Sequence, residues 1–140
     1  MKINFYFNDT VITIPQRTRL KKHLTGIFER EERQLQSLTY IFCTDKYLFS
    51  INKKFLQHDD YTDIITFCLS DLHDPVVGEI YISVDRIRDN AKSLGISTNT
   101  ELHRVVFHGA LHLCGFNDKS RKDKKRMTQE EDKNLKIYFM

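Results

Sequence analysis

The sequence predicts an α+β fold in a single domain, with a small mixed sheet of about four strands packed against about five helices. The chain has 140 residues, of which 40% are hydrophobic, and this is enough to bury one sizeable core. No internal repeat, low-complexity tract or Gly/Ser-rich linker divides it. Strand-like and helix-like segments are intermixed with few clean βαβ units, which favours α+β over a regular α/β architecture.

Four segments account for the predicted sheet. Residues 2–7 alternate apolar and polar side chains, and residues 10–14 add a short apolar stretch before Pro15, so we expect the chain to start with a strand or hairpin. Residues 38–43 follow the same strand pattern. The segments "IITFCLS" and "VVGEIYIS" are rich in β-branched and aromatic residues, and the short connection "DLHDP" predicts that they pair.

The first two helices are predicted because the spacing of apolar residues changes from the alternation of a strand to the period of a helix. Over residues 16–32, apolar side chains recur on one helical face. Asp45 is expected to cap a second helix, which buries Leu48 and Ile51 and runs to about residue 56.

Three further helices fill the second half of the chain. Residues 84–95 carry an apolar face and end at Gly95, a residue suited to a C-terminal cap. Thr98 and Glu101 form a capping-box pattern ahead of the next helix. Ser120 repeats the N-terminal signal before a last helix that reaches about residue 138.

Composition narrows the class of protein. The charged content of 29% and the net charge of +3 are ordinary for a soluble domain, and no apolar run approaches the length of a membrane span. The N-terminus lacks the continuous apolar block of a secretory signal. Three widely spaced cysteines suit reduced thiols better than a disulfide framework, so we expect a cytoplasmic protein.

A possible metal site lies in "FHGALHLCGFND". His108 and His112 are four residues apart on one helical face, and Gly115 can turn the chain so that Asp118 supplies a third ligand. Two histidines and a carboxylate leave coordination positions open, which is typical of catalytic rather than structural zinc. We therefore predict one Zn²⁺ ion per chain at these three residues. Cys114 lies inside the motif but on another helix face, which disfavours it as a ligand.

Positive charge is concentrated directly after this motif. The stretch "KSRKDKKR" at residues 119–126 has six basic residues and one acidic residue. Such a cluster attracts polyanions such as nucleic acid, although a solvated helix face is the plain alternative. The predicted RNA-binding side chains are Arg121, Lys122, Lys124, Lys125 and Arg126.

Taken together, "HGALHLCGFND", "YTDIITF" and "VVGEIYIS" resemble the YbeY-type endoribonucleases, also called ribosomal RNA maturation factors. The resemblance implies that residues 1–140 form a zinc-dependent, cytoplasmic endoribonuclease domain. It implies single-stranded RNA as substrate, small-subunit ribosomal RNA maturation and ribosome quality control as roles, and the ribosomal subunit as a partner. The metal histidines of the family fall on His108 and His112, while its third histidine falls on Asp118.

This chain departs from the family pattern at two further positions. An arginine common ahead of the T-D segment is Leu56 here, so we expect Arg104 or His58 to restore positive charge near the metal. Glu79 replaces a usual aspartate and keeps its charge.

The predicted catalytic residues are therefore Arg104, His58 and Asp63, acting with a metal-bound water. Asp63 would orient water or substrate, but a turn-capping role explains it equally well, and Asn52 has the same ambiguity.

Two other functions compete with this interpretation. The ligand spacing is that of metzincin metallopeptidases, but Gly109 stands where a peptidase needs its proton-accepting glutamate. A non-catalytic RNA-binding or ribosome-binding module would also use the basic cluster, although no RNP-type aromatic strand is present.

Overall fold

The structure is a computed structural model that describes residues 2–56 and 62–140. This part of the chain forms one small α+β domain with four strands and five helices, which confirms the predicted fold class. In chain order the elements are β1 (Ile3–Asn8), α1 (Arg17–Arg30), β2 (Leu35–Cys43), α2 (Asp45–Leu56), β3 (Ile64–Cys68), β4 (Val76–Ser83), α3 (Val84–Leu94), α4 (Thr98–Leu113) and α5 (Arg121–Tyr138).

The sheet is mixed, with strand order β1-β2-β4-β3. β1, β2 and β4 run parallel, and β3 pairs antiparallel with β4 at one edge, with Cys68 opposite Gly78. This pairing confirms the one predicted for "IITFCLS" and "VVGEIYIS". No bulky crossover is needed between antiparallel neighbours, so their short connection suffices.

The chain starts with a strand, β1, as expected, but residues 10–14 do not add a second strand to make a hairpin. These residues form no strand and instead carry the chain from β1 to α1. β2 lies parallel to β1, so the chain must cross over through a helix before it returns to the sheet, and a hairpin would have reversed it. The apolar residue Ile14 is still explained, because it is buried in the core.

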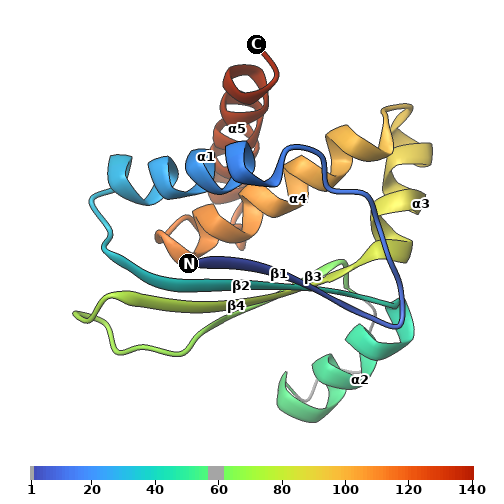
Figure 1. Ribbon diagram of the computed structural model, residues 1–140, viewed down its shortest axis with the longest axis horizontal. Helices are drawn as coiled ribbons and strands as arrows, with labels where there is room; N and C mark the ends of the chain where they lie inside the picture. Colours follow the sequence, from blue (N-terminus) through green and yellow to red (C-terminus); the bar gives the residue numbers. More distant parts are fainter. Residues whose placement is uncertain (1, 57–61) are drawn as a thin grey trace.

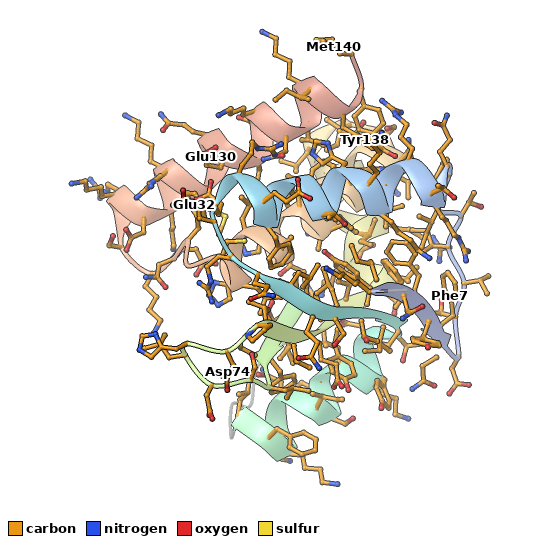
Figure 2. The ribbon with its side chains drawn as sticks, turned by 60° about the vertical axis from the view of Figure 1, so that its left-hand side comes forward. Phe7, Glu32, Asp74, Glu130, Tyr138 and Met140 are labelled. Carbon is orange, nitrogen blue, oxygen red and sulfur yellow. The ribbon has the colours of Figure 1, made fainter. Side chains whose placement is uncertain are left out.

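The helices are divided unequally between the two faces of the sheet (Figure 1). α1 and α4 lie over one face, α5 stacks beyond them, and α2 lies beneath the other face. The main core fills the space between the sheet and the upper helices, where apolar side chains are crowded together (Figure 2). A smaller cluster between α2 and the sheet consists of Cys43, Leu48, Ile51 and Ile65. α4 is therefore covered by the sheet on one side and by helices on the other.

Side-chain caps fix the helix ends, with two differences from the sequence prediction. Ser120 accepts from the backbone N–H of Asp123, and Gly95 closes α3 with a φ of 67°, both as expected. α4, however, is capped by Ser97 rather than by Thr98, and Glu101 is drawn into the protein interior.

The second difference concerns α2. Thr44, and not Asp45, caps this helix by accepting from the N–H of Tyr47. The carboxylate of Asp45 instead accepts a hydrogen bond from Arg86 at 3.0 Å. In α2 the carboxylate of Asp45 is engaged by a long-range ion pair, and the neighbouring hydroxyl of Thr44 takes the cap.

α4 approaches the sheet closely at two glycines. A Cβ atom added at Gly109 would lie 2.8 Å from Cδ1 of Ile80, and one added at Gly78 would lie 2.5 Å from Cδ1 of Leu113. These contacts leave no room for a side chain at either position. Among the described residues, no helix is both long and apolar enough to cross a membrane.

This close approach predicts opposite effects for two alanine substitutions in helices. Gly26 lies within α1, and the nearest atom to an added Cβ is the distal Arg30 Nη1, at 3.5 Å. We expect Gly26→Ala to raise the free energy of unfolding by about 1 kcal/mol through helix propensity. Gly109→Ala should lower it by about 1 kcal/mol, because overpacking that costs roughly 1–3 kcal/mol exceeds the same propensity gain. Urea unfolding of both variants gives the comparison, and stabilisation of similar size in both would contradict the tight packing at Gly109.

Candidate active site

His108 and His112 project from α4 into a cleft beside the edge strand β3. Each ring is partly buried. The cleft has a volume of about 370 Å³, and its lining residues are Asn52, Leu56, Thr62, Ile64, Ile65, Thr66, His108, His112, Asp118 and Lys119. The two histidines are presented together because residues four apart share a helical face, as the sequence predicts.

Asp118 reaches the same cleft from the loop between α4 and α5. Gly115 has a φ of 106°, a left-handed conformation that favours glycine and lets the chain turn back after the helix. This turn places Asp118 Oδ2 3.4 Å from Nε2 of His108. The predicted turn at Gly115 is therefore present, and it delivers the carboxylate to the first histidine.

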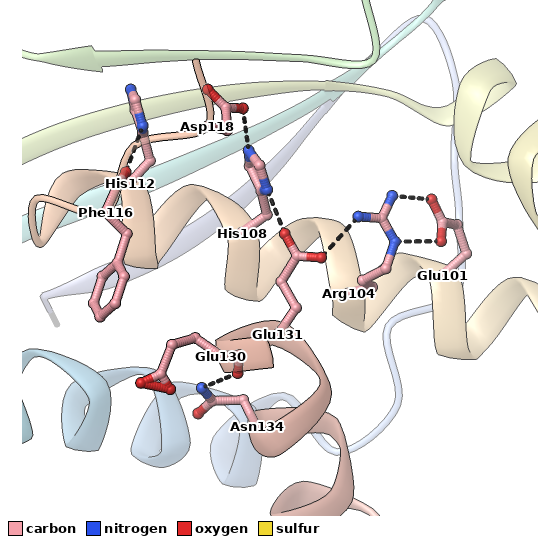
Figure 3. A network of polar contacts seen from close by, with 9 residues as sticks. All are labelled: Glu101, Arg104, His108, His112, Phe116, Asp118, Glu130, Glu131 and Asn134. Carbon is pink, nitrogen blue, oxygen red and sulfur yellow. Dashed lines mark hydrogen bonds and ion pairs between the residues drawn. The ribbon is translucent and has the colours of Figure 1, made fainter. Parts of the chain in front are cut away.

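Both imidazoles are oriented through their Nδ1 atoms (Figure 3). Nδ1 of His108 lies 2.5 Å from Oε2 of Glu131, and Nδ1 of His112 lies 3.1 Å from the backbone oxygen of Phe116. Because a carbonyl oxygen only accepts, Nδ1 of His112 carries the proton, and the same holds for His108 facing a carboxylate. When each ring is neutral, this arrangement leaves its Nε2 atom as a lone-pair donor, which is the usual orientation of histidines that hold a metal.

The side chains of His108, His112 and Asp118 thus suit a metal ion in the type of their donor atoms, and the two histidines suit it in the orientation of their rings. Within residues 2–56 and 62–140, no three His, Cys, Asp or Glu side chains are grouped closely enough to hold an ion together. His108 and Asp118 are in contact, whereas His112 lies one turn further along the cleft.

The protonation of His108 reflects its acidic surroundings. Burial disfavours the imidazolium, but the hydrogen bond and charge of Glu131, with Asp118 and Asp63 nearby, outweigh burial and raise its pKa above the ordinary value. Nδ1 of His108 thus faces a carboxylate, whereas Nδ1 of His112 faces a neutral backbone carbonyl.

Arg104 is held by two carboxylates. Its Nε and Nη2 atoms donate to Glu101 at 2.7 and 2.6 Å, and its Nη1 atom donates to Glu131 at 3.1 Å. Hydrogen bonds to Glu101, followed by the charges of both carboxylates, raise the pKa of Arg104, which stays charged. The structure therefore places Arg104 beside the site but commits much of its guanidinium to these two partners. A contact with RNA phosphate remains a prediction.

The sequence reasoning missed Glu131 and the role of Glu101. A periodic signal was available for Glu131, because it falls on the buried face of α5 with Met127, Asn134 and Tyr138. A carboxylate on an otherwise buried helix face needs a partner. Nothing in the sequence identified His108 and Arg104 as that partner, because they belong to a different helix.

Of the two other predicted catalytic residues, the structure describes Asp63 but not His58. Asp63 lines a second pocket of about 290 Å³ with Thr62, Ile64, Arg104, Val105, His108 and Asp118. Its backbone oxygen also accepts from the N–H of Ser83, so a structural role coexists with access to the site. His58 lies outside the described residues.

The two positions that depart from the family pattern also differ in location. Leu56 lines the cleft itself, so it borders the candidate site. Glu79 accepts a hydrogen bond from the Tyr81 hydroxyl at 2.7 Å, and it is absent from the residues that line the cleft.

The basic cluster adjoins the cleft through its first residue and the start of α5. Lys119 lines the cleft, and the five basic side chains predicted to bind RNA are all exposed. The guanidinium of Arg126 lies 4.9 Å from the ring centroid of Phe116, the residue whose carbonyl orients His112. The cluster therefore extends outward from the candidate metal ligands along one helix.

Comparison with known proteins identifies the family. A family model described as "Endoribonuclease YbeY" matches residues 4–138. The chain belongs to the YbeY endoribonuclease family. The endoribonuclease YbeY of Cytophaga hutchinsonii is 43% identical over 135 residues, which cover 96% of this chain and 94% of that protein. The endoribonuclease YbeY of Porphyromonas gingivalis strain W83 is 42% identical over 134 residues, covering 96% and 88%.

A solved structure shares the fold of this chain. The solution structure of TM1509 from Thermotoga maritima matches with a TM-score of 0.65 and 24% identity, over 98% of this chain and 89% of that chain. At this identity the likeness shows the fold alone. The resemblance and the α+β class predicted from sequence are both confirmed.

Cys114 is directed away from the candidate ligands. It packs against the main core, and burial raises its pKa to about 12. Burial likewise raises the pKa of Cys43 to about 12, whereas Cys68 is exposed. Cysteine binds a metal ion as the thiolate. A Cys114 thiol that burial keeps protonated is therefore poorly suited to be a ligand of the candidate metal site.

These environments predict one fast-reacting thiol in the folded protein. The reagent DTNB, which reports free thiolates, should modify Cys68 rapidly and Cys43 and Cys114 much more slowly, while all three react fast in denaturant. Cys68→Ser should remove the fast phase. A fast phase that persists in this variant and disappears in Cys114→Ser would show that Cys114 is accessible near the site.

Proposed function

We propose that this protein is a metal-dependent endoribonuclease specific for single-stranded RNA, acting in small-subunit ribosomal RNA maturation and ribosome quality control. The observation that carries the proposal is the pair of cleft imidazoles whose Nδ1 atoms are both engaged, with Nε2 of His108 only 3.4 Å from Oδ2 of Asp118. Membership of the YbeY family and relatives named as endoribonucleases supply the type of reaction. Hydrolysis of an RNA phosphodiester bond is the expected reaction.

The cofactor we propose is one Zn²⁺ ion per chain, held by His108, His112 and Asp118. When bound there, zinc would activate water and stabilise negative charge on a phosphoryl oxygen. The carbonyl of Phe116 and the carboxylate of Glu131 hold the two rings in the tautomer that ligation needs. Other first-row divalent ions would accept the same donors.

The lining of the cleft supports a single-stranded substrate. The lining includes the apolar side chains of Leu56, Ile64 and Ile65 and the polar side chains of Asn52 and Lys119. Unstacked bases can contact the apolar side chains while Lys119 binds phosphate, whereas paired bases in a duplex are not available for such contacts. Asp63, which borders the neighbouring pocket, is placed to orient water or the attacked phosphate group.

The setting we propose is the cytoplasm, with ribosomal RNA and the ribosomal subunit as partners. The exposed basic residues at the start of α5 suit a large polyanion. Three free cysteines among the described residues agree with a reducing compartment.

The metallopeptidase alternative is disfavoured by the packing of Gly109. This position faces Ile80 of β4 and Ile64 of β3 rather than the cleft. A glutamate at the same place would be directed into the core and could not accept a proton from a water in the cleft. The site therefore lacks the base that peptide hydrolysis of this type uses.

The first prediction of this proposal concerns the ligands. Wild-type protein should take up one zinc ion per chain and cleave single-stranded RNA. His112→Ala should lose both while retaining RNA affinity, because the basic cluster is untouched. Asp118→His should keep metal and cleavage, since imidazole can replace carboxylate as a ligand, and Asp118→Ala should weaken both. Elemental analysis and a cleavage assay with fluorescent RNA measure these outcomes.

The contradicting outcomes separate the competing functions. A wild-type protein that binds RNA but neither takes up zinc nor cleaves would point to the non-catalytic binding module. Chelator-sensitive cleavage of casein without RNA cleavage would restore the metallopeptidase alternative. Full metal occupancy in Asp118→Ala would show that Asp118 is not a ligand.

The second prediction concerns the basic cluster. Replacing Lys124, Lys125 and Arg126 by glutamine removes charges that release counterions when RNA binds. Affinity for single-stranded RNA should fall, and the slope of log K against log salt should decrease by about 0.7 per lost phosphate contact. The rate of cleavage on saturating RNA should change little. Fluorescence anisotropy at several salt concentrations measures the slope, and an unchanged slope would show that these side chains are merely solvated.

A further inference from the structure

A chain of buried ionic contacts runs from the candidate metal ligand His108 back into the protein (Figure 3). Glu131 on α5 lies between His108 and Arg104: its Oε2 is 2.5 Å from Nδ1 of His108, and its Oε1 is 3.1 Å from Nη1 of Arg104. Arg104 in turn binds Glu101 through two further nitrogens. Each oxygen of Glu131 therefore has a different partner.

The two carboxylates are almost completely removed from solvent. Glu131 is 3% exposed and Glu101 is 0% exposed. A buried carboxylate is costly unless it is paired and hydrogen-bonded. The single guanidinium of Arg104 serves both carboxylates, and His108 supplies the remaining partner of Glu131. Removing Arg104 would leave both buried carboxylates without the cation that they share.

The contacts show the order in which these residues hold one another, from Glu101 to Arg104, Glu131 and His108. Glu101 accepts two hydrogen bonds from the planar guanidinium and so fixes its plane. The fixed guanidinium holds one oxygen of Glu131, which leaves the other oxygen aimed at His108. Glu101, Arg104 and His108 lie three and four residues apart on one face of α4, while Glu131 comes from the helix packed against it.

We infer that Glu131 is the positioning residue for His108, and that Arg104 and Glu101 hold Glu131 in place. The inference rests on the proposed function, since it concerns how His108 is prepared to bind a metal ion. A carboxylate at Nδ1 fixes the ring orientation, keeps the proton on Nδ1 and makes Nε2 a stronger donor. His112 receives only a backbone carbonyl at the same position, so the stronger support is given to His108.

This positioning role differs from that of an ion pair that only joins two helices. Such an ion pair would contribute to the free energy of unfolding and leave the metal affinity of the folded protein unchanged. A positioning role requires that metal affinity falls in a variant that remains folded. It also requires a particular tautomer of His108 before any metal is added.

The central test compares Glu131→Gln with Glu130→Gln in the full chain. Both remove one negative charge from neighbouring positions of α5, but Glu130 lies outside the chain of contacts that reaches His108 (Figure 3). Metal-free proteins are titrated with Zn²⁺ in competition with a chromogenic chelator. Glu131→Gln should bind Zn²⁺ about 10–100-fold more weakly than wild type, whereas Glu130→Gln should match wild type.

Circular dichroism and thermal unfolding of the metal-free variants accompany the titration. A folded Glu131→Gln that binds zinc as tightly as wild type overturns the inference and leaves the proposed function intact. Wild-type protein that binds no zinc defeats the proposed function instead.

A second measurement needs no variant of Glu131 and so survives any failure of that variant to fold. Histidine side-chain ¹H–¹⁵N spectra of metal-free wild type, recorded in alkaline buffer where the ring is neutral, report which nitrogen carries the proton. The inference requires His108 to carry it on Nδ1, with Nε2 bare, and His108→Asn identifies the signal. A proton on Nε2 of His108 overturns the inference whatever the metal titration shows.

Discussion

The structure depends on the close packing of α4 against the sheet. Gly109 lets the helix backbone approach Ile80, and Gly78 makes room for Leu113, so the helix lies closer to β4 than side chains would otherwise allow. Packing at this density fixes the rotation of α4 about its axis. Once the face carrying Gly109 is turned to the sheet, the face carrying His108 and His112 must open toward the cleft beside β3.

The second feature of the molecule is how α4 is held on its other side. α5 contributes apolar residues such as Met127 to the core, but it also inserts Glu131 among the polar groups of α4. The ionic contacts satisfy groups that would otherwise be costly to bury. As a result, the same helix pair that completes the core also orients the candidate metal ligand. Stability and the preparation of the site are coupled through α5.

The candidate site departs from the family pattern at Asp118, the proposed third ligand, and at Leu56, which stands where the family commonly has an arginine. The structure gives each departure a local setting. Asp118 is brought beside His108 by the turn at Gly115, and Leu56 contributes an apolar surface to the cleft. Positive charge near the cleft comes instead from Lys119 and the exposed start of α5. Affinity for RNA would then depend on a cluster beside the cleft more than on one arginine within it.

The sequence by itself determined the elements whose signals are local. Helical periodicity placed both histidines on one face, glycines marked the ends at Gly95 and Gly115, and short connections predicted the pairing of β3 with β4. These features depend on interactions between near neighbours along the chain, so they are readable without knowledge of the fold.

The tertiary structure alone decided which polar residues are buried and what they contact. Glu101 resembled a capping residue and the sequence reasoning did not single out Glu131, yet both are buried and share Arg104. Residues 10–14 resembled a strand, but the parallel return to β2 made them a connection. The burial of Glu131 and the path of residues 10–14 depend on partners distant in sequence, and the burial of Glu101 depends on how α4 packs, so none of them can be read from a single segment.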